Sequence, residues 1–192
     1  MNILYEDSDL LVVEKPAGIP VESRKIGVPD MNSLLKNYLA SQSLNHPPYL
    51  GMIHRLDQPV QGVMAFAKTP RAAKTLSLDL ANGSMTKHYL AVVTGIPPEE
   101  GELTDFLRKD GRTNTSAIVP KGTPGAKLAR LTYRRISVLP SESLSLVQIH
   151  LLTGRHHQIR VQMAGAGFPL YGDRKYNPSP GQAGEGLYFR SP

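Results

Sequence analysis

The sequence predicts an α+β fold, built on a mixed, largely antiparallel sheet with flanking helices. It contains many short apolar stretches bounded by turn residues, about three segments with helical features, and no regular alternation of strand and helix. Residues 101–125, which are rich in Gly, Thr and basic side chains, are expected to separate two strands. The expected strands are two within 3–15 and one each over 49–54, 62–68, 87–95, 127–139 and 144–152.

The three expected helices are marked by their apolar spacing and by their end signals. Residues 32–43 carry apolar side chains at helical spacing. Thr69 and Pro70 provide an N-cap and a proline at the first helical position, and Gly83 closes that helix. A third helix is expected to start at 153–154 and to continue through residue 164.

Composition excludes several classes of protein. The 192 residues contain no Cys, which excludes disulfide scaffolds, thiolate zinc sites and cysteine nucleophiles. The longest apolar stretches, such as 62–67, are far shorter than the roughly 20 residues of a membrane span. Residues 1–7 are acidic and run directly into a strand pattern, without the basic and apolar regions of a secretion signal. We therefore expect a cytoplasmic monomer without membrane contact, with residues 1–192 forming one domain and a Pro/Gly-rich tail starting near 177.

The net charge of +6 is distributed unevenly along the chain. Residues 1–107 carry 9 basic and 12 acidic side chains, whereas residues 108–192 carry 13 basic and 4 acidic ones. A basic segment of this kind favours a polyanion such as RNA, because neutralised phosphates release counterions. A solvated basic face without a partner is the competing interpretation. The segment 108–135 holds Arg108, Lys109, Arg112, Lys121, Lys127, Arg130, Arg134 and Arg135.

Asp57 is the first candidate for chemistry, in the segment 51–59. An expected strand ends there in a loop that also holds His54 and Arg55, and Pro59 biases the preceding residue toward an extended conformation. A carboxylate with fixed geometry can act as a nucleophile or as a general base. A lone loop Asp more often caps a turn, so the pattern alone leaves both interpretations open.

The second candidate segment, 153–162, opens the last expected helix. Arg155 and the backbone N–H groups of the first turn would suit an anion such as phosphate. On that helix, His156 and Arg160 would share one face. The Arg160 guanidinium could hold a carboxylate from another loop in its ionised form, or could be an ordinary surface cation that contributes little.

Two further segments could belong to a site. Alternation along the expected strand places Lys87 and Tyr89 on one face. Tyr89 could stack on a nucleobase or handle a proton, although such a Tyr is more often part of the core. The segment 167–176 is rich in turn residues and could line a site or could have only a structural role.

Taken together, these motifs resemble those of the RluA-type family of RNA pseudouridine synthases. Members carry the motifs HRLD, K-x-Y, TGR-x-H-Q-[IL]-R and G-x-P-[IL]-x-G-D in this order, and the resemblance covers about residues 2–176. The corresponding segments here are 54–57, 87–89, 153–160 and 167–173, and 10–18 is similar to the family's start.

The resemblance implies isomerisation of a uridine in ribosomal or transfer RNA to its C-glycoside, without a metal or an organic cofactor. It implies that Asp57 is the catalytic carboxylate, that Tyr89 stacks on the target base, and that Arg160 ion-pairs with Asp57. Arg55 would help to hold the RNA. The remaining RNA-binding candidates are His54, Lys87, Arg155, Arg130, Arg134 and Arg135.

Two features of the sequence depart from the family pattern, and two other functions compete with RNA pseudouridine synthesis. After Asp57, the usual Thr-Ser-Gly is replaced by Val60-Gln61-Gly62, and the chain after residue 177 lacks the usual further strands and helix. A non-catalytic RNA-binding module of the same fold is the first alternative. A metal-dependent hydrolase is the second, with the ligands His150, His156 and His157, but adjacent helical histidines point about 100° apart and make a poor metal site.

Overall fold

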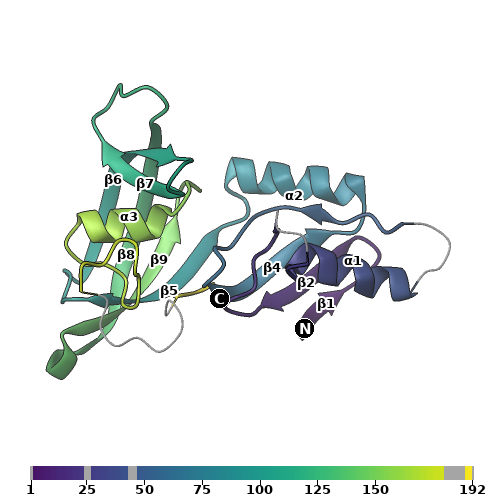
Figure 1. Ribbon diagram of the computed structural model, residues 1–192, viewed down its shortest axis with the longest axis horizontal. Helices are drawn as coiled ribbons and strands as arrows, with labels where there is room; N and C mark the ends of the chain where they lie inside the picture. The colour runs from purple at the N-terminus through teal and green to yellow at the C-terminus, as the bar shows by residue number, and fades with distance from the viewer. Residues whose placement is uncertain (1, 24–26, 43–46, 180–188, 192) are drawn as a thin grey trace. The chain divides into compact units, whose positions relative to one another are not determined.

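The computed structural model describes residues 2–23, 27–42, 47–179 and 189–191, and its contacts divide the chain into two compact units. Unit 1 runs to Met85 and includes Ser191, and unit 2 runs from Thr86 to Arg190. Strands and helices are present in both units (Figure 1), which confirms the expected α+β class. A single catalytic domain over residues 1–192 stays a prediction.

Unit 2 is built on an antiparallel sheet with the strand order β5-β9-β8-β6-β7 (Figure 1). The expected strands over 87–95, 127–139 and 144–152 are confirmed, and a 3-10 helix, η1 (Pro140–Glu142), joins β8 to β9. A further strand, β10, lies within the expected tail and pairs with β5. The strands are β5 (Lys87–Thr94), β6 (Glu100–Asp110), β7 (Thr115–Val119), β8 (Lys127–Leu139), β9 (Leu144–Leu151) and β10 (Phe189–Ser191).

The hairpin of β6 and β7 corrects the expectation that residues 101–125 only separate strands. Along β6, Leu103 and Leu107 alternate with the exposed side chains of Glu102 and Thr104, so only half of the strand is apolar. The hairpin turn is closed by the Asp110 carboxylate, which accepts hydrogen bonds from the backbone amides that follow it. The amino-acid composition of 101–125 did not indicate strands, because the exposed side chains of the hairpin are mostly polar.

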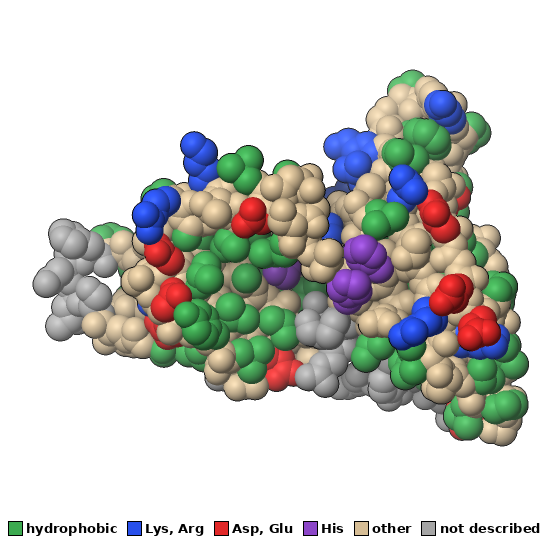
Figure 2. Space-filling view, turned by 180° about the vertical axis from the view of Figure 1, so that it is seen from behind, with side chains coloured by type: hydrophobic (Ala, Val, Ile, Leu, Met, Phe, Trp, Pro, Cys, Tyr) green, Lys and Arg blue, Asp and Glu red, His purple; other side chains and the backbone are tan. Residues whose placement is uncertain are grey.

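Helix α3 (Gln158–Gly165) covers one face of this sheet (Figure 1). Its Val161 packs against Leu107 of β6 and Ala129 of β8 in a small buried cluster. We call the opposite side of the sheet the open face. Acidic and basic side chains are interspersed on this face of unit 2 (Figure 2).

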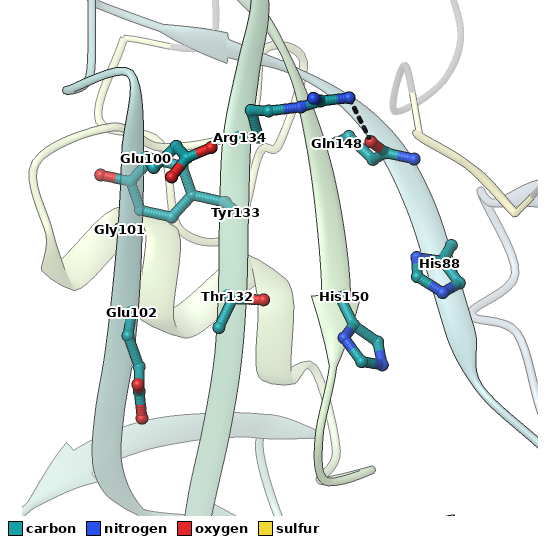
Figure 3. Close-up of a pocket in the computed structure, with 9 residues that line it drawn as sticks. All are labelled: His88, Glu100, Gly101, Glu102, Thr132, Tyr133, Arg134, Gln148 and His150. Carbon is teal, nitrogen blue, oxygen red and sulfur yellow. Dashed lines mark hydrogen bonds between the residues drawn. The ribbon is translucent and has the colours of Figure 1, made fainter. Parts of the chain in front are cut away.

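The open face carries a depression of about 510 Å³ across β5, β9, β8 and β6. The imidazoles of His88 and His150 stack here with their ring centres 4.5 Å apart, and Arg134 reaches toward Gln148 (Figure 3). The depression is lined by His88, Glu100, Gly101, Glu102, Thr132, Tyr133, Arg134, Gln148 and His150.

Helix α3 begins later than residue 153, which corrects the sequence expectation. The Gln158 side-chain oxygen accepts hydrogen bonds from the Arg155 amide at 2.9 Å and from the Thr153 hydroxyl at 2.8 Å. These bonds close a separate turn, and His157 then enters the helix in a left-handed conformation with φ 53°. His156 therefore precedes the helix, and the expected helical face shared by His156 and Arg160 is wrong.

Unit 1 contains the antiparallel sheet β1-β2-β4, with a short β3 paired to β4. The strand expected over 49–54 is only two residues long. The reason is local, because the His54 Nε2 accepts the Ala65 amide at 3.3 Å and replaces the next main-chain bond of the ladder. The strands are β1 (Asn2–Glu6), β2 (Leu10–Lys15), β3 (Gly51–Met52) and β4 (Gln61–Ala67).

The two expected helices of unit 1 are confirmed as α1 (Met31–Gln42) and α2 (Pro70–Asn82). At the start of α2, the Thr69 hydroxyl accepts the Ala72 amide at 3.2 Å. The helix ends at Gly83, whose left-handed φ of 84° is readily adopted only by a residue without a side chain. No helix in the described part of the chain combines the length and apolar character needed to cross a bilayer.

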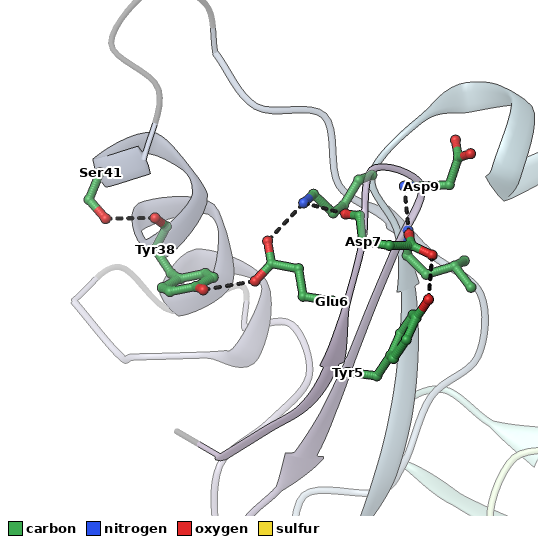
Figure 4. A network of polar contacts seen from close by, with 8 residues as sticks. Tyr5, Glu6, Asp7, Asp9, Tyr38 and Ser41 are labelled. Atoms are coloured by element: carbon green, nitrogen blue, oxygen red, sulfur yellow. Dashed lines mark hydrogen bonds and ion pairs between the residues drawn. The ribbon is translucent and has the colours of Figure 1, made fainter.

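A polar network fixes α1 and the acidic turn between β1 and β2 (Figure 4). Glu6 accepts hydrogen bonds from the Lys68 ammonium at 2.7 Å and from the Tyr38 hydroxyl of α1 at 2.8 Å. The bond from Lys68 is the main reason that the pKa of Glu6 lies below its usual value. Asp7 accepts the Leu10 amide and so closes the turn. These bonds hold the edge of the unit 1 sheet in place.

Candidate active site

Asp57 lies in the loop between β3 and β4, held by a buried residue on each side. Leu56 is 6% exposed and Val60 is fully buried, whereas Asp57 is half-buried. The Val60 amide donates to the Asp57 carbonyl at 3.0 Å, which forms a tight turn at this point. The loop therefore presents the carboxylate from a fixed backbone.

A buried ammonium accompanies this loop and was missed by the sequence analysis. Lys15, the last residue of β2, is 0% exposed. Its Nζ donates to the carbonyl oxygens of Pro16, Ile19 and Gln58 at 2.8, 2.7 and 3.0 Å. Burial lowers the pKa of Lys15 to about 8, although attraction to Asp57 opposes this shift. The available signal was the alternation of β2, which places position 15 on the same inward face as Leu11 and Val13.

Two loops of unit 1 are joined through Gln58. Its backbone oxygen accepts the Gly18 amide at 2.9 Å, and its side-chain amide donates to the Gly18 oxygen at 2.9 Å. Gly18 has φ +85°, a left-handed conformation that other residues adopt only with strain. Together with the bond from Lys15, these contacts fix the residue that directly follows Asp57.

His54 and Arg55, the other two candidates in this loop, lie in different surroundings from Asp57. His54 points back toward β4, where its Nε2 accepts the Ala65 amide. Arg55 has a side chain that is 72% exposed, and its nearest acidic atom, on Glu22, is 3.8 Å away. A long contact between exposed groups contributes little to stability. RNA binding by His54 and Arg55 stays a prediction.

In unit 2, Arg160 on α3 forms a forked ion pair with Asp173. The guanidinium Nε donates to Oδ2 at 2.8 Å and Nη2 donates to Oδ1 at 2.7 Å. Asp173 is fully buried and also accepts the Lys175 amide at 2.9 Å. Burial alone would raise the pKa of Asp173, but the hydrogen bonds and charge of Arg160 hold it below its usual value. Asp173 ends the motif over 167–173, but the spacing of that motif does not reveal that its carboxylate is the partner of Arg160.

Tyr176 connects this ion pair to the β6–β7 hairpin. The Arg160 guanidinium lies 5.1 Å from the centre of the Tyr176 ring. The Tyr176 hydroxyl accepts the Ser116 amide of β7 at 2.8 Å and lies 2.7 Å from Nδ1 of His157. Burial, followed by the charge of Arg160, lowers the pKa of His157 to about 3. A neutral His157 can accept the tyrosine proton at Nδ1, so the charge state and the hydrogen bonds agree.

Tyr89 and Lys87 lie on one face of β5, as their spacing predicted. Tyr89 is 6% exposed, so most of its ring is enclosed. Lys87 is half-buried, and burial together with the nearby Arg155 lowers its pKa. Base stacking by Tyr89 stays a prediction, as does RNA binding by Lys87.

The three arginines predicted to bind RNA from β8 have partners within the protein. Arg130 donates to the Glu102 carboxylate at 2.8 Å, where both side chains are about half exposed. The Arg134 Nη2 donates to the Gln148 side-chain oxygen at 3.4 Å. Arg135 is half-buried and donates to the carbonyl oxygen of Pro97. Their RNA contacts stay a prediction, and the charge of Arg130 is partly balanced by Glu102.

The histidines considered as metal ligands are used in other contacts. His150 stacks on His88, and His156 stacks on His157 with ring centres 3.8 Å apart. Across the described ranges, no group of three or more His, Cys, Asp or Glu side chains is arranged to hold a metal ion.

Residues 9–165 match the family described as RNA pseudouridylate synthase. The chain belongs to this family. The RluA-type resemblance inferred from the motifs is thereby confirmed.

Individual relatives agree with this family. Ribosomal large subunit pseudouridine synthase D of Haemophilus influenzae is 34% identical over 186 residues, which cover 94% of this chain and 54% of the relative. An uncharacterised RNA pseudouridine synthase of Bacillus subtilis is 34% identical over 182 residues, which cover 93% of this chain and 58% of the relative. The chain therefore spans little more than half the length of these curated relatives.

The fold is also that of the family. The structure of human RNA pseudouridylate synthase domain containing 4 superposes with a TM-score of 0.80, covering 99% of this chain and 82% of the human one. At 22% identity, this likeness supports the fold. It confirms the pseudouridine synthase catalytic fold that the resemblance implied.

Proposed function

We propose that this chain isomerises uridine in RNA to pseudouridine and that Asp57 is the catalytic carboxylate. Family membership supports the reaction, and the position of Asp57 within the HRLD motif supports its role. The observation that carries the proposal is the construction of the Asp57 loop. A half-buried carboxylate is presented by a backbone that Lys15 and Gly18 fix, close to a buried positive charge.

The reaction requires one bond to break and another to form at the same sugar carbon. The C1′–N1 bond is cleaved, the uracil turns over, and C5 bonds to C1′ while the proton leaves C5 and N1 gains one, so the reaction is balanced without a co-reactant. Asp57 can take part either by attacking C1′ or as a base on the sugar, and both routes need an ionised carboxylate. The buried ammonium of Lys15 lies near this carboxylate and is held in place by three backbone carbonyl oxygens.

The proposal extends to Tyr89 and Arg160 through their positions in the family motifs. Tyr89 would stack on the uracil after the nucleotide leaves its helix, which offsets part of the cost of unstacking. The family resemblance implies that Arg160 pairs with the catalytic carboxylate, and its Nε and Nη2 are bonded to Asp173. A guanidinium has five N–H donors and can serve more than one carboxylate.

Ribosomal RNA is the substrate class that we propose, because the Haemophilus relative is named for the large ribosomal subunit. Arg55, Arg155 and the basic segment 108–135 would bind its phosphates. We further propose that the protein acts as a cytoplasmic monomer.

The proposed function is tested with ribosomal RNA isolated from cells that lack the gene. Incubation with the wild-type protein should produce pseudouridine at one or more positions, read by chemical mapping of the RNA. Asp57→Asn should reduce the rate by at least about three orders of magnitude, because its amide cannot replace an ionised carboxylate. Asp79→Asn on α2 makes the same chemical change elsewhere and should leave the rate unchanged. RNA binding without turnover by the wild type would favour the non-catalytic module.

A further inference from the structure

Unit 2 contains a second, smaller cavity, on the side of the sheet that carries α3. Its volume is about 200 Å³, and it lies between the β6–β7 hairpin, the start of β8 and the turn before α3. A cavity of this size is below the usual range of about 300–1,000 Å³ for a whole small-molecule ligand. It is lined by Leu107, Lys109, Ser116, Gly125, Lys127, Gly154, Arg155 and His156.

The charge of this lining is entirely positive. Lys109, Lys127 and Arg155 come from three separate segments of the chain, and the lining contains no acidic side chain. Within the described ranges, none of the three forms an ion pair, in contrast to Arg130 with Glu102 on the open face. Cations that converge without a counter-charge are typical of a site for an anion.

The wall of the cavity is held rigidly. The Arg155 Nε donates to the Leu128 carbonyl at 2.8 Å, which fixes the guanidinium beside β8. The two ring nitrogens of His156 lie 2.9 Å from the Ser116 hydroxyl and 3.1 Å from the Asn114 side-chain oxygen. Binding of a ligand therefore costs little conformational entropy in these side chains, because they are already ordered.

A fourth cation lies just outside the lining. A β-carbon built on Gly154 would lie 3.1 Å from the Lys87 ammonium, so the missing side chain leaves room for it. Burial and the charge of Arg155 lower the pKa of Lys87. An anion bound beside Arg155 would relieve this repulsion.

We infer that this cavity binds one phosphate of the RNA backbone. The inference rests on the proposed function, which supplies RNA as the polymer. Two ammonium groups and a guanidinium fixed by the Leu128 carbonyl supply positive charge and N–H donors for the two non-bridging oxygens of a phosphodiester. The small volume admits a phosphate rather than a base with its sugar, and the cavity thereby positions the RNA without reading its sequence.

The test compares two doubly substituted proteins that lose the same charge. Lys109→Gln/Lys127→Gln removes two cations of the cavity, and Lys36→Gln/Lys74→Gln removes two exposed lysines from α1 and α2. Binding to a fluorescein-labelled stem-loop RNA with a uridine-containing loop is measured by anisotropy between 50 and 300 mM salt. The cavity variant should bind about tenfold more weakly at low salt, and its slope of log K against log salt should be smaller by about one.

Several outcomes would overturn the inference. These are equal losses in the two variants, an unchanged salt slope, or competition by an acidic peptide but not by an unlabelled RNA of unrelated sequence. Free phosphate at millimolar concentration should compete only weakly with the RNA, and full competition would assign the cavity to the free ion. Thermal melting of both variants confirms that they are folded.

The same proteins separate this inference from the proposed function. If the wild type forms no pseudouridine but the cavity variant still binds RNA more weakly than the control, the phosphate site stands and the enzymatic proposal fails. If the wild type is active and the cavity variant binds like the control, the phosphate site alone is wrong.

Discussion

Asp57 in unit 1 and Asp173 in unit 2 each lie near a buried cation, but the two cations are used differently. Arg160 gives two of its donors to the Asp173 carboxylate, which is fully buried. Lys15 donates to three backbone carbonyls, and the nearby half-buried Asp57 opposes the lowering of the Lys15 pKa by burial. The comparison assigns Asp173 to the stability of the fold and leaves the half-buried Asp57 on its fixed loop for the catalytic role that we propose.

The largest effect on stability is expected at the forked ion pair. Asp173→Asn keeps the shape of the side chain but removes the charge that balances Arg160, and breaking a buried pair costs about 3 kcal/mol or more. Urea unfolding should show this loss. Glu102→Gln, which breaks the exposed pair with Arg130, is the control and should cost less than about 1 kcal/mol. Equal losses of unfolding free energy in the two variants would show that the buried ion pair stabilises the protein no more than the exposed one.

Replacement of Lys15 should lower the activity of the folded protein more than Asp173→Asn does. Lys15→Met leaves three carbonyl oxygens without their donor and removes the charge near Asp57, so we expect a loss of about 2 kcal/mol of stability. At a temperature where the variant is folded, kcat should fall about tenfold, which corresponds to about 1.4 kcal/mol. Lys68→Met, which breaks the pair with Glu6, should lower stability and leave kcat unchanged. A wild-type kcat for Lys15→Met would show that Lys15, like Arg160 at Asp173, serves only the stability of the fold.

A smaller effect should depend on pH through His157, the neighbour of Arg160. Its pKa is about 3 in the folded protein and near 6.5 when unfolded, so the unfolded chain binds the extra proton between these values. Stability is therefore lost as the pH falls from 6.5 toward 3, and the loss is about 2 kcal/mol at pH 5. His157→Asn, which tolerates the left-handed backbone, should abolish this part of the pH dependence in thermal melts. His88→Asn on the open face should retain it, and an identical pH profile in both variants would contradict the assignment.

The parts of the fold that were predicted correctly are those whose signals are local. Thr69, Pro70 and Gly83 define α2 at both ends, because caps act within one turn. The hairpin of β6 and β7 was missed because its apolar side chains alternate with exposed charges. The start of α3 was misplaced because the Gln158 side chain binds the preceding turn, which residue spacing cannot reveal.

The same distinction applies to the site. Motifs singled out Asp57, Tyr89 and Arg160, since a family pattern can be read along the chain. Lys15 and the Asp173 partner of Arg160 were not recognised, because their contacts form only when distant segments pack together. The cavity at Lys109 and Lys127 was likewise hidden within a long basic segment, whose members turn out to face opposite sides of one sheet.

The contacts of Tyr176 have a mechanical consequence. Its hydroxyl is bonded to the Ser116 amide of the hairpin, and its ring lies beside the guanidinium of Arg160. One stiff aromatic side chain therefore spans the distance from the hairpin that forms a wall of the basic cavity to the buried arginine. Tyr176 therefore joins the β6–β7 hairpin to the side chain of Arg160, alongside the contacts of His156 with Ser116 and Asn114.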